Sequence, residues 1–220
     1  MKYPKASAAV AVAVAAGIGV TAWTWSGSEG KAEPHQKEMT GSRVTEPLRA
    51  EHKTLLPHIE ALADAGDAIG TAPAEEQREK VHASYTFLTK QLIPHAVAED
   101  KVLYVKVDSL IGGNGGNGGN VSTKAADTMR RDHVEVGTLT DELGELGEKL
   151  HEGKLTPAEQ QELRRVLYSL NGIVGLHFAK EEEVFLPLLD QKLNAAQAQQ
   201  MFEEMEKVTE ESGGEGGHAH

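Results

Sequence analysis

Apolar residues recur at intervals of three and four along most of the chain after Val44, the spacing that places side chains on one face of an α-helix. The first such run spans Thr45 to Ile69, and its apolar positions are Leu48, Leu55, Leu56, Ile59, Leu62 and Ala65. Pro47 fits within the first turn, where the helix needs no backbone donor. We therefore expect a helix over 45–69 and a turn at 70–73.

A second run continues to about Leu110 and contains one proline. Its apolar positions are Val81, Tyr85, Leu88, Leu92, Val102 and Leu103. Pro94 removes one backbone hydrogen bond, so this helix should bend there. The sequence GGNGGNGGN at 112–120 follows. It has no side chains with which to bury surface and predicts a flexible connection.

The second half of the chain repeats this layout. A third helix is predicted over 122–151, ended by Gly153, with apolar positions Met129, Val136, Leu139, Leu143, Leu146 and Leu150. Thr156 and Glu159 form a capping-box sequence that opens a fourth helix. Its apolar positions are Leu163, Leu167, Leu170, Val174, Val184 and Leu188. A shorter amphipathic segment over 193–208 carries Met201, Phe202 and Met205.

Long helices joined by short or flexible segments, with few competing β-patterned stretches, predict an all-α fold. The expected architecture over 44–210 is an antiparallel up-and-down four-helix bundle with a short fifth C-terminal helix. The polar stretch 26–43 should be a linker, and 211–220 a disordered tail.

Residues 1–25 form an N-terminal apolar segment, and no charge occurs between Lys5 and Glu29. These 23 uncharged residues exceed the roughly 20 needed to cross a bilayer as a helix, and two tryptophans stand at the far end like interfacial anchors. Val-Thr-Ala at 20–22 also fits a signal-peptide cleavage pattern. Three interpretations stay open: a membrane anchor, a signal segment on an exported protein, and a leader on a cytoplasmic protein.

The net charge and the absence of cysteine exclude several classes of partner and of functional site. The formal net charge is −12 and no basic cluster interrupts it, which argues against nucleic acid as a partner. The absence of cysteine excludes disulfides, thiolate zinc sites, iron–sulfur clusters and cysteine nucleophiles. Any bound metal must be held by nitrogen and oxygen.

Two segments share one arrangement of ligand-type residues. HAVAEDKVLY at 95–104 and HFAKEEEVFL at 177–186 each place a glutamate four residues after a histidine. An acidic residue followed by histidine, at 51–52 and 132–133, precedes these histidines by 43 and 44 residues (95 − 52 and 177 − 133). Four residues bring a histidine and a glutamate to within ~40° on one helix face, about 6 Å apart along the axis.

These side chains face the predicted core. The apolar residues in line with them are Leu88, Leu92 and Val102 for His95; Leu170, Val174 and Val184 for His177; Leu48, Leu55, Leu56 and Ile59 for His52; and Met129, Val136 and Thr140 for His133. A buried carboxylate without a partner costs several kcal/mol. The two predicted buried carboxylates, Glu99 and Glu181, lie among four imidazoles, which indicates that cations are bound between them. The alternative is a helical bundle in which the histidines only pack.

Six ligands are too many for one tetrahedral zinc and suit two metals of five or six coordination, bridged by Glu99 and Glu181. Imidazole and carboxylate without sulfur favour iron, with manganese or zinc as weaker candidates.

The segments AEHKTLLPHIEAL, HAVAEDKVLY, RRDHVEV and HFAKEEEVFLPLL resemble the hemerythrin-like, or HHE cation-binding, family over about 44–190. The resemblance implies a four-helix bundle with an oxo- or hydroxo-bridged di-iron centre, in a family whose members carry oxygen, sense oxygen or iron, or handle nitric oxide and peroxide. The ligands that it implies are His52, His95, Glu99, His133, His177 and Glu181, with the two glutamates bridging.

The sequence departs from the oxygen-carrying hemerythrins at two places. Those proteins have two histidines four apart on the third helix, whereas Met129 and Gly137 flank His133 here. They also end with an aspartate five residues after the last histidine, where this chain offers Glu181 at four. The variant with His-x-x-x-Glu in each half is the closer relative, and simple reversible oxygen transport is in doubt.

We expect a di-iron protein that binds or responds to O2, peroxide or nitric oxide. The alternative is an iron-binding or iron-sensing module that acts through a partner, by way of the helix after Leu193. A peroxidase-like or catalase-like activity stays open, because the same ligand set serves carriers, sensors and catalysts.

Several neighbouring residues are expected to play no direct part. Tyr85 and Tyr104 should pack in the core, with donation to the centre as the alternative. His58 should lie at the surface or in a hydrogen bond outside the site, with a role as a seventh ligand as the alternative. The acidic residues beside the motifs should form a solvated face, unless one of them supports a ligand; they are Asp100, Glu182 and Glu183.

Overall fold

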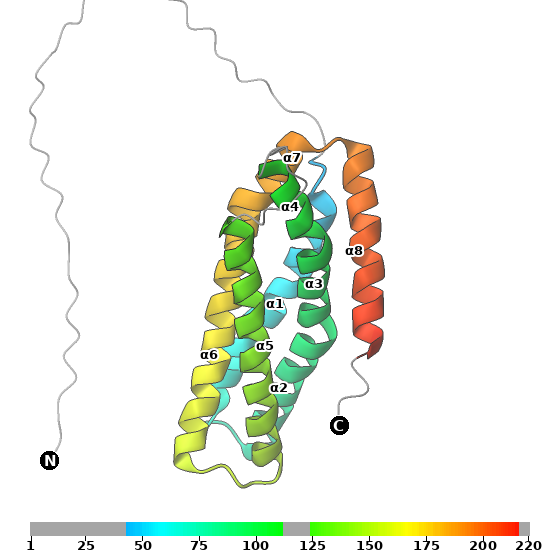
Figure 1. Ribbon diagram of the computed structural model, residues 1–220. Helices are drawn as coiled ribbons and strands as arrows, with labels where there is room; N and C mark the ends of the chain where they lie inside the picture. The colour runs from blue at the N-terminus through cyan, green and yellow to red at the C-terminus, as the bar shows by residue number, and fades with distance from the viewer. Residues whose placement is uncertain (1–42, 112–123, 216–220) are drawn as a thin grey trace, which may run out of the picture. The chain divides into compact units, whose positions relative to one another are not determined.

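The computed structural model describes residues 43–111 and 124–215, which are helical apart from short turns and contain no strand (Figure 1). The N-terminal apolar segment, nearly all of the linker, the glycine-rich connection and the last five residues lie outside the described residues, and their predictions stay predictions. No helix in the described part of the chain is long and apolar enough to cross a membrane.

The first half consists of one helix, a turn and a long helical column. α1 (Glu46–Ala68) ends before Gly70, whose φ of 76° is a backbone conformation that side chains disfavour. The column then runs without a break through α2 (Ala74–Phe87), η1 (Leu88–Leu92), α3 (Ile93–Ala98), η2 (Glu99–Leu103) and α4 (Tyr104–Ile111), where η marks a π-helical turn. Pro94 stands in the first turn of α3, directly after η1.

The second half repeats a helix, a turn and a column. α5 (Lys124–His151) is followed by Gly153 with φ of 68°. The predicted capping box is confirmed, because the Thr156 hydroxyl accepts from the Glu159 amide and the Glu159 carboxylate accepts from the Thr156 amide. The elements after it are α6 (Pro157–Lys180), η3 (Glu181–Phe185), α7 (Leu186–Lys192) and α8 (Ala195–Glu215). Residues 211–215, which we expected in the tail, are therefore helical.

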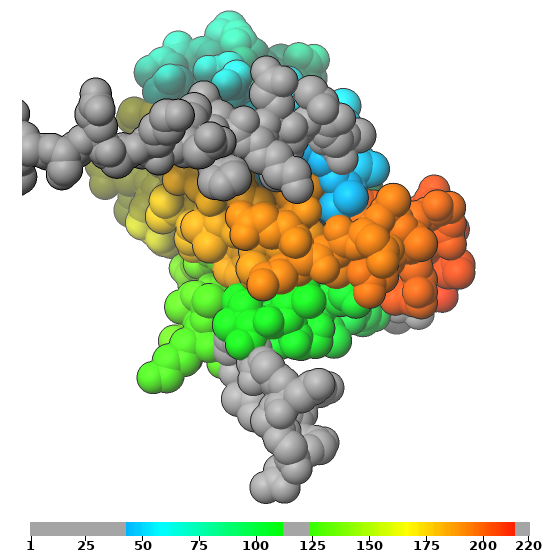
Figure 2. All heavy atoms as spheres, turned by 90° about the horizontal axis from the view of Figure 1, so that it is seen from above, coloured from blue at the N-terminus to red at the C-terminus, as the bar shows by residue number. Residues whose placement is uncertain are grey.

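α1, α5 and the two columns pack around a shared interior. α1 lies along α2 and α6, and α5 lies along α2 and α6 (Figure 1). α8 packs outside them against α3 and η2 and buries Met201 and Met205. Seen from the end of the bundle that carries α7, the orange residues of α7 and the start of α8 lie across that end (Figure 2).

The buried apolar side chains form two clusters. One contains Leu62, Leu92 and Leu143, and the other contains Leu103 and Met129. Phe178 of the first cluster and Tyr104 of the second both contact candidate ligands. The ligands thus lie where the two clusters meet.

The π-helical turns η2 and η3 determine which side chains after them face the interior. α-Helical spacing predicts Val102 and Val184 there, seven residues after His95 and His177. The prediction is wrong for Val184, which is 59% exposed, and Val102 is only partly buried. The next residue along the chain is buried in each case, Phe185 and Leu103. A π-helical turn takes up one extra residue, so the buried face advances by one position beyond it. The same shift buries Leu189 and leaves Leu188 half-buried.

Most other predicted core positions are confirmed, including all six in α5. Two are wrong: Leu56 is 42% exposed and Tyr85 is 38% exposed. Tyr85 lies over Gly144 of α5, where a Cβ atom would come within 3.0 Å of its ring, so the ring rests on the helix surface.

Candidate metal centre

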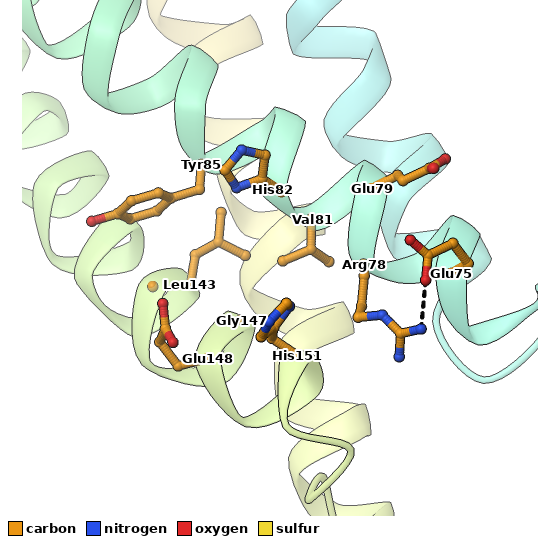
Figure 3. A pocket seen from close by; sticks show the side chains of 11 residues that line it. Glu75, Arg78, Glu79, Val81, His82, Tyr85, Leu143, Gly147, Glu148 and His151 are labelled. Carbon is orange, nitrogen blue, oxygen red and sulfur yellow. Dashed lines mark hydrogen bonds and ion pairs between the residues drawn. The ribbon is translucent and has the colours of Figure 1, made fainter.

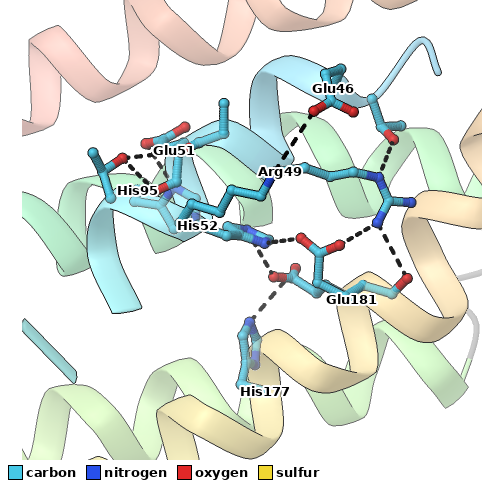
Figure 4. Close-up of polar contacts among 12 residues, drawn as sticks. Glu46, Arg49, Glu51, His52, His95, His177 and Glu181 are labelled. Carbon is cyan, nitrogen blue, oxygen red and sulfur yellow. Dashed lines mark hydrogen bonds and ion pairs between the residues drawn. The ribbon is translucent and has the colours of Figure 1, made fainter. Parts of the chain in front are cut away.

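The structure brings together all six residues that the sequence singled out. His52 comes from α1, His95 from α3, His133 from α5 and His177 from α6, while Glu99 and Glu181 are the first residues of η2 and η3. All are buried except His133, whose side chain is still only 9% exposed. Figure 4 shows His52 and His177 turned toward Glu181.

Their ligand atoms form two groups that share one residue. The first contains His52, His95, Glu99 and Glu181, and the second contains Glu99, His133 and His177; within each group the atoms lie within 4.8 Å of one another. Glu99 Oε1 lies 3.0 Å from His95 Nε2 and 3.9 Å from His52 Nε2. Glu99 Oε2 lies 3.3 Å from His133 Nε2 and 3.8 Å from His177 Nε2. One carboxylate therefore faces two pairs of imidazoles.

Glu181 also spans the two groups. Its Oε2 lies 3.5 Å from His52 Nε2, and its Oε1 lies 3.7 Å from His177 Nε2. The Tyr104 hydroxyl donates to the same Oε1 at 2.6 Å. Tyr104 is fully buried, as predicted, but it is also a donor to a candidate ligand, so packing is only half of its role.

The cluster has the character of a cation site. Five of its buried atoms make no hydrogen bond among the described residues, although an oppositely charged atom lies within 3.9 Å of each: His52 Nε2, His95 Nε2, both oxygens of Glu99, and Glu181 Oε2. Buried polar atoms in proteins are nearly always paired. In addition, His133 Nε2 and His177 Nε2 lie 3.0 Å apart, about the separation of two nitrogens bound at right angles to one cation through bonds of ~2.1 Å. The residues present fit bound metal.

A second set of carboxylates holds the outer nitrogen of every candidate histidine. The contacts to Nδ1 are Glu182 to His52 at 2.9 Å, Glu51 to His95 at 2.9 Å, Asp100 to His133 at 2.9 Å and Asp132 to His177 at 3.1 Å. Asp100 and Glu182 do not merely form a solvated face, because each is partly buried against an imidazole, and the alternative that one of these acids supports a candidate ligand holds for both. Each of the four stands next to a candidate ligand in the sequence, and that adjacency was the available signal.

Burial opposes charge on both glutamates, and their surroundings decide which stays ionised. Burial and the negative charge of Glu99 raise the pKa of Glu181 to about 7. Burial acts on Glu99 in the same direction, but the charge of His95 and contacts with other imidazoles hold its pKa well below the usual range. Burial disfavours charge on His133, yet the carboxylates of Asp100 and Glu99 raise its pKa to about 9. A cation entering the cluster must therefore displace protons from histidine.

A small cavity of about 10 Å³ adjoins the cluster. Its polar wall is formed by His95, Glu99, His133 and His177, and its apolar wall by Leu92, Ala96, Val136, Val174 and Phe178. This volume is close to the minimum that holds one water molecule. Only a very small ligand fits beside the centre.

A wider groove of about 940 Å³ lies between α2 and α5 (Figure 3). Tyr85, His82 and His151 line it. Among the described residues, the two ligand groups above are the places where metal-binding side chains converge, and neither includes a residue of this groove. His58 also lies outside the centre, exposed and stacked on Phe87 at 5.0 Å between ring centroids.

Comparison with known proteins agrees with this geometry. The family profile of the hemerythrin HHE cation-binding domain matches residues 43–146 and, again, residues 124–213. The first match contains His95 and Glu99, and the second contains His177 and Glu181. Neither the curated proteins nor the solved structures with which the chain was compared give a match. The buried histidine and glutamate cluster and the matched profile together indicate a metal-binding protein. The chain belongs to the hemerythrin HHE cation-binding domain family.

Proposed function

We propose that the chain is a non-haem di-iron protein with an antiparallel up-and-down four-helix bundle, which binds O2, peroxide or nitric oxide at a carboxylate-bridged pair of irons. The proposed ligands are His52, His95, Glu99, His133, His177 and Glu181. The observation that carries the proposal is the position of Glu99, whose two oxygens face different histidine pairs. A carboxylate in that position would bridge two cations if one were bound at each pair.

The donor set favours iron. Four imidazoles and two carboxylates, without sulfur, suit iron with five or six ligands, whereas structural zinc takes four. Manganese and zinc are weaker candidates. When bound, the iron pair supplies reversible electron transfer and open coordination positions for a small ligand.

The two cation positions differ in their surroundings. The Glu181 oxygen that faces His177 also accepts from Tyr104, whereas the oxygen that faces His52 does not. The small cavity lies against both histidines of the second position, the shared Glu99, and one histidine of the first position, His95. A small ligand therefore has space mainly at the second position.

The surrounding residues control access and hold protons. The apolar wall of the cavity excludes bulk water from the bound ligand. Tyr104 belongs to the other apolar cluster and holds its proton between its own oxygen and Glu181 Oε1. It therefore acts on a bridging carboxylate, not on the occupant of the cavity.

The test is ligand binding by the full chain after iron loading without oxygen. Nitric oxide and then O2 should each change the visible absorption spectrum. Val174→Leu adds a methylene group to the cavity wall and should slow or weaken this response about tenfold or more, the scale for one methylene in a tight pocket. Val166→Leu, at an equally buried position on the same helix away from the cavity, is the matched control. No response in wild type, or equal effects of the two variants, would contradict the proposal.

The second candidate is an iron-sensing module that acts through a partner. The observation in its favour is that α8 packs on α3 and η2, the segments that carry His95 and Glu99. In this case chelation should increase hydrogen exchange in α8, and the iron-loaded protein should not respond to the small ligands.

A further inference from the structure

We propose that Glu51, Asp100, Asp132 and Glu182 are positioning residues that set the affinity of the two cation positions separately, two carboxylates for each position. This inference rests on the proposed di-metal function and deepens it.

The four contacts fix which nitrogen of each imidazole can bind a cation. Every carboxylate lies 2.9 to 3.1 Å from a histidine Nδ1. An N–H at Nδ1 that donates to this carboxylate leaves the lone pair on Nε2, the nitrogen that faces the cluster. It also holds the plane of the ring. The histidines are thus oriented by their outer contacts before any cation arrives.

The contacts close a ring around the bundle. Glu51 of α1 holds His95 of α3, and Asp100, which follows Glu99 on the same column, holds His133 of α5. Asp132 of α5 holds His177 of α6. Glu182, on the column of α6, returns to His52 of α1 and completes the ring. α1, α5 and each of the two columns therefore carry one carboxylate that contacts a histidine of one neighbour, and one histidine that is contacted by a carboxylate of another.

Two of the four carboxylates belong to each cation position. His52 and His95 share the first ligand group, and their carboxylates are Glu182 and Glu51. His133 and His177 share the second group, and theirs are Asp100 and Asp132. Removing one carboxylate should therefore weaken one position and spare the other.

Within each pair, one carboxylate is held more firmly. Glu182, whose side chain is 33% exposed against 46% for Glu51 of the same pair, forms an ion pair with the buried Arg49. Asp132 forms an ion pair with Lys180, and its side chain is 20% exposed. Glu51 and Asp100 are more exposed, at 46% and 35%. Because solvent weakens such contacts, loss of Glu182 or Asp132 should have the larger effect.

The test is titration of the metal-free full chain with Co²⁺, followed by visible absorption against a competing chelator. His133→Ala leaves the position of His52 and His95, and His95→Ala leaves the other one. Glu51→Gln should weaken Co²⁺ binding about 10-fold to 100-fold in the first background, the usual effect of losing a ligand's outer partner, and should have little effect in the second. Asp132→Asn should show the reverse pattern.

Controls separate this effect from a general loss of stability. Glu135→Gln and Glu183→Gln remove exposed carboxylates beside the site and should leave both positions unchanged. Helix content of each metal-free variant is checked by circular dichroism, and Asp100→Asn replaces Asp132→Asn if the latter does not fold. Equal weakening at both positions, or none, in a protein that binds two Co²⁺ ions overturns the inference and leaves the di-metal function standing. A wild-type chain that binds no Co²⁺ overturns both.

Discussion

Replacing Tyr104 with phenylalanine removes one oxygen atom and keeps the buried ring. The ring centroid lies 5.9 Å from that of Phe185 and 5.7 Å from the Arg130 guanidinium carbon, and neither contact needs the hydroxyl. The hydroxyl itself donates to Glu181 Oε1 at 2.6 Å and lies 3.1 Å from His177 Nε2. Tyr104→Phe therefore isolates one hydrogen bond to a buried carboxyl group.

The magnitude depends on the charge of Glu181. A hydrogen bond to a charged group contributes about 1.5–3 kcal/mol, and a neutral one about 1 kcal/mol. The pKa of Glu181 is raised to about 7, so the group is mostly charged at about pH 8.5 and mostly neutral at about pH 5.5. The metal-free variant should lose about 2–3 kcal/mol of unfolding free energy at the higher pH and about 1 kcal/mol at the lower.

The assay is urea unfolding of the chelator-treated protein, followed by circular dichroism at both pH values. Tyr168→Phe is the matched control, because Tyr168 is 38% exposed and donates to Asp67 at the surface. A surface contact of this kind is worth at most about 1 kcal/mol. A Tyr104→Phe loss that does not grow with pH, or that equals the loss in the control, would show that the hydroxyl does not stabilise a charged Glu181.

Three further predictions concern pH, metal and helix register. The pKa of His133 is raised from 6.5 to about 9, so the stability that its charged form contributes is complete below pH 6.5 and is lost as the pH rises through 9. Over that range the metal-free protein should lose up to about 3 kcal/mol of unfolding free energy, measured by thermal unfolding. A stability that does not change with pH would count against the buried contacts of His133. Glu181 should add a loss between its ordinary pKa and about 7. Iron at a thousand times its dissociation constant should stabilise the fold by about 4 kcal/mol, which a chelator reverses; no shift in the unfolding midpoint would argue against binding to the folded state. Phe185→Ala should cost about 3–5 kcal/mol in urea unfolding and Val184→Ala less than about 1 kcal/mol, whereas the opposite order would rule out the register shift at η3.

Three of the candidate histidines, His52, His133 and His177, could be predicted because the helices that carry them follow α-helical spacing up to the ligands themselves. His133 lies on a helix that is α-helical throughout, and its neighbours Met129, Val136 and Thr140 are all buried as expected. His52 is similar, apart from Leu56 at the edge of the apolar face. Local periodicity was sufficient at these positions.

Beyond Glu99 and Glu181 the same spacing fails by one residue. The π-helical turns η2 and η3 begin at these two residues, and no local feature of the sequence separates such a turn from an ordinary helical one. Pro94 and Pro187 signal interruptions nearby but not the shift. For this reason donation by Tyr104 could be predicted only as the alternative to packing, and its acceptor, Glu181, could not be identified.

The contacts of the outer carboxylates could not be predicted for a different reason. Glu51, Asp100 and Glu182 have side chains that are 33% to 46% exposed, so in the sequence they resemble other solvated acids. What distinguishes them is a contact with a histidine on another helix. That contact depends on how the columns assemble, which periodicity along one helix does not encode.

If six side chains hold two irons, the iron content of the full chain should show it. Wild type and a Glu99→Ala, Glu181→Ala double variant should be produced with excess iron, freed of loose metal, and measured for iron per chain together with their optical and electron paramagnetic resonance spectra. We expect two magnetically coupled irons per wild-type chain, because Glu99 faces both histidine pairs, and loss of this centre in the double variant. One iron or none in the wild-type chain, or two irons that survive in the double variant, would contradict it.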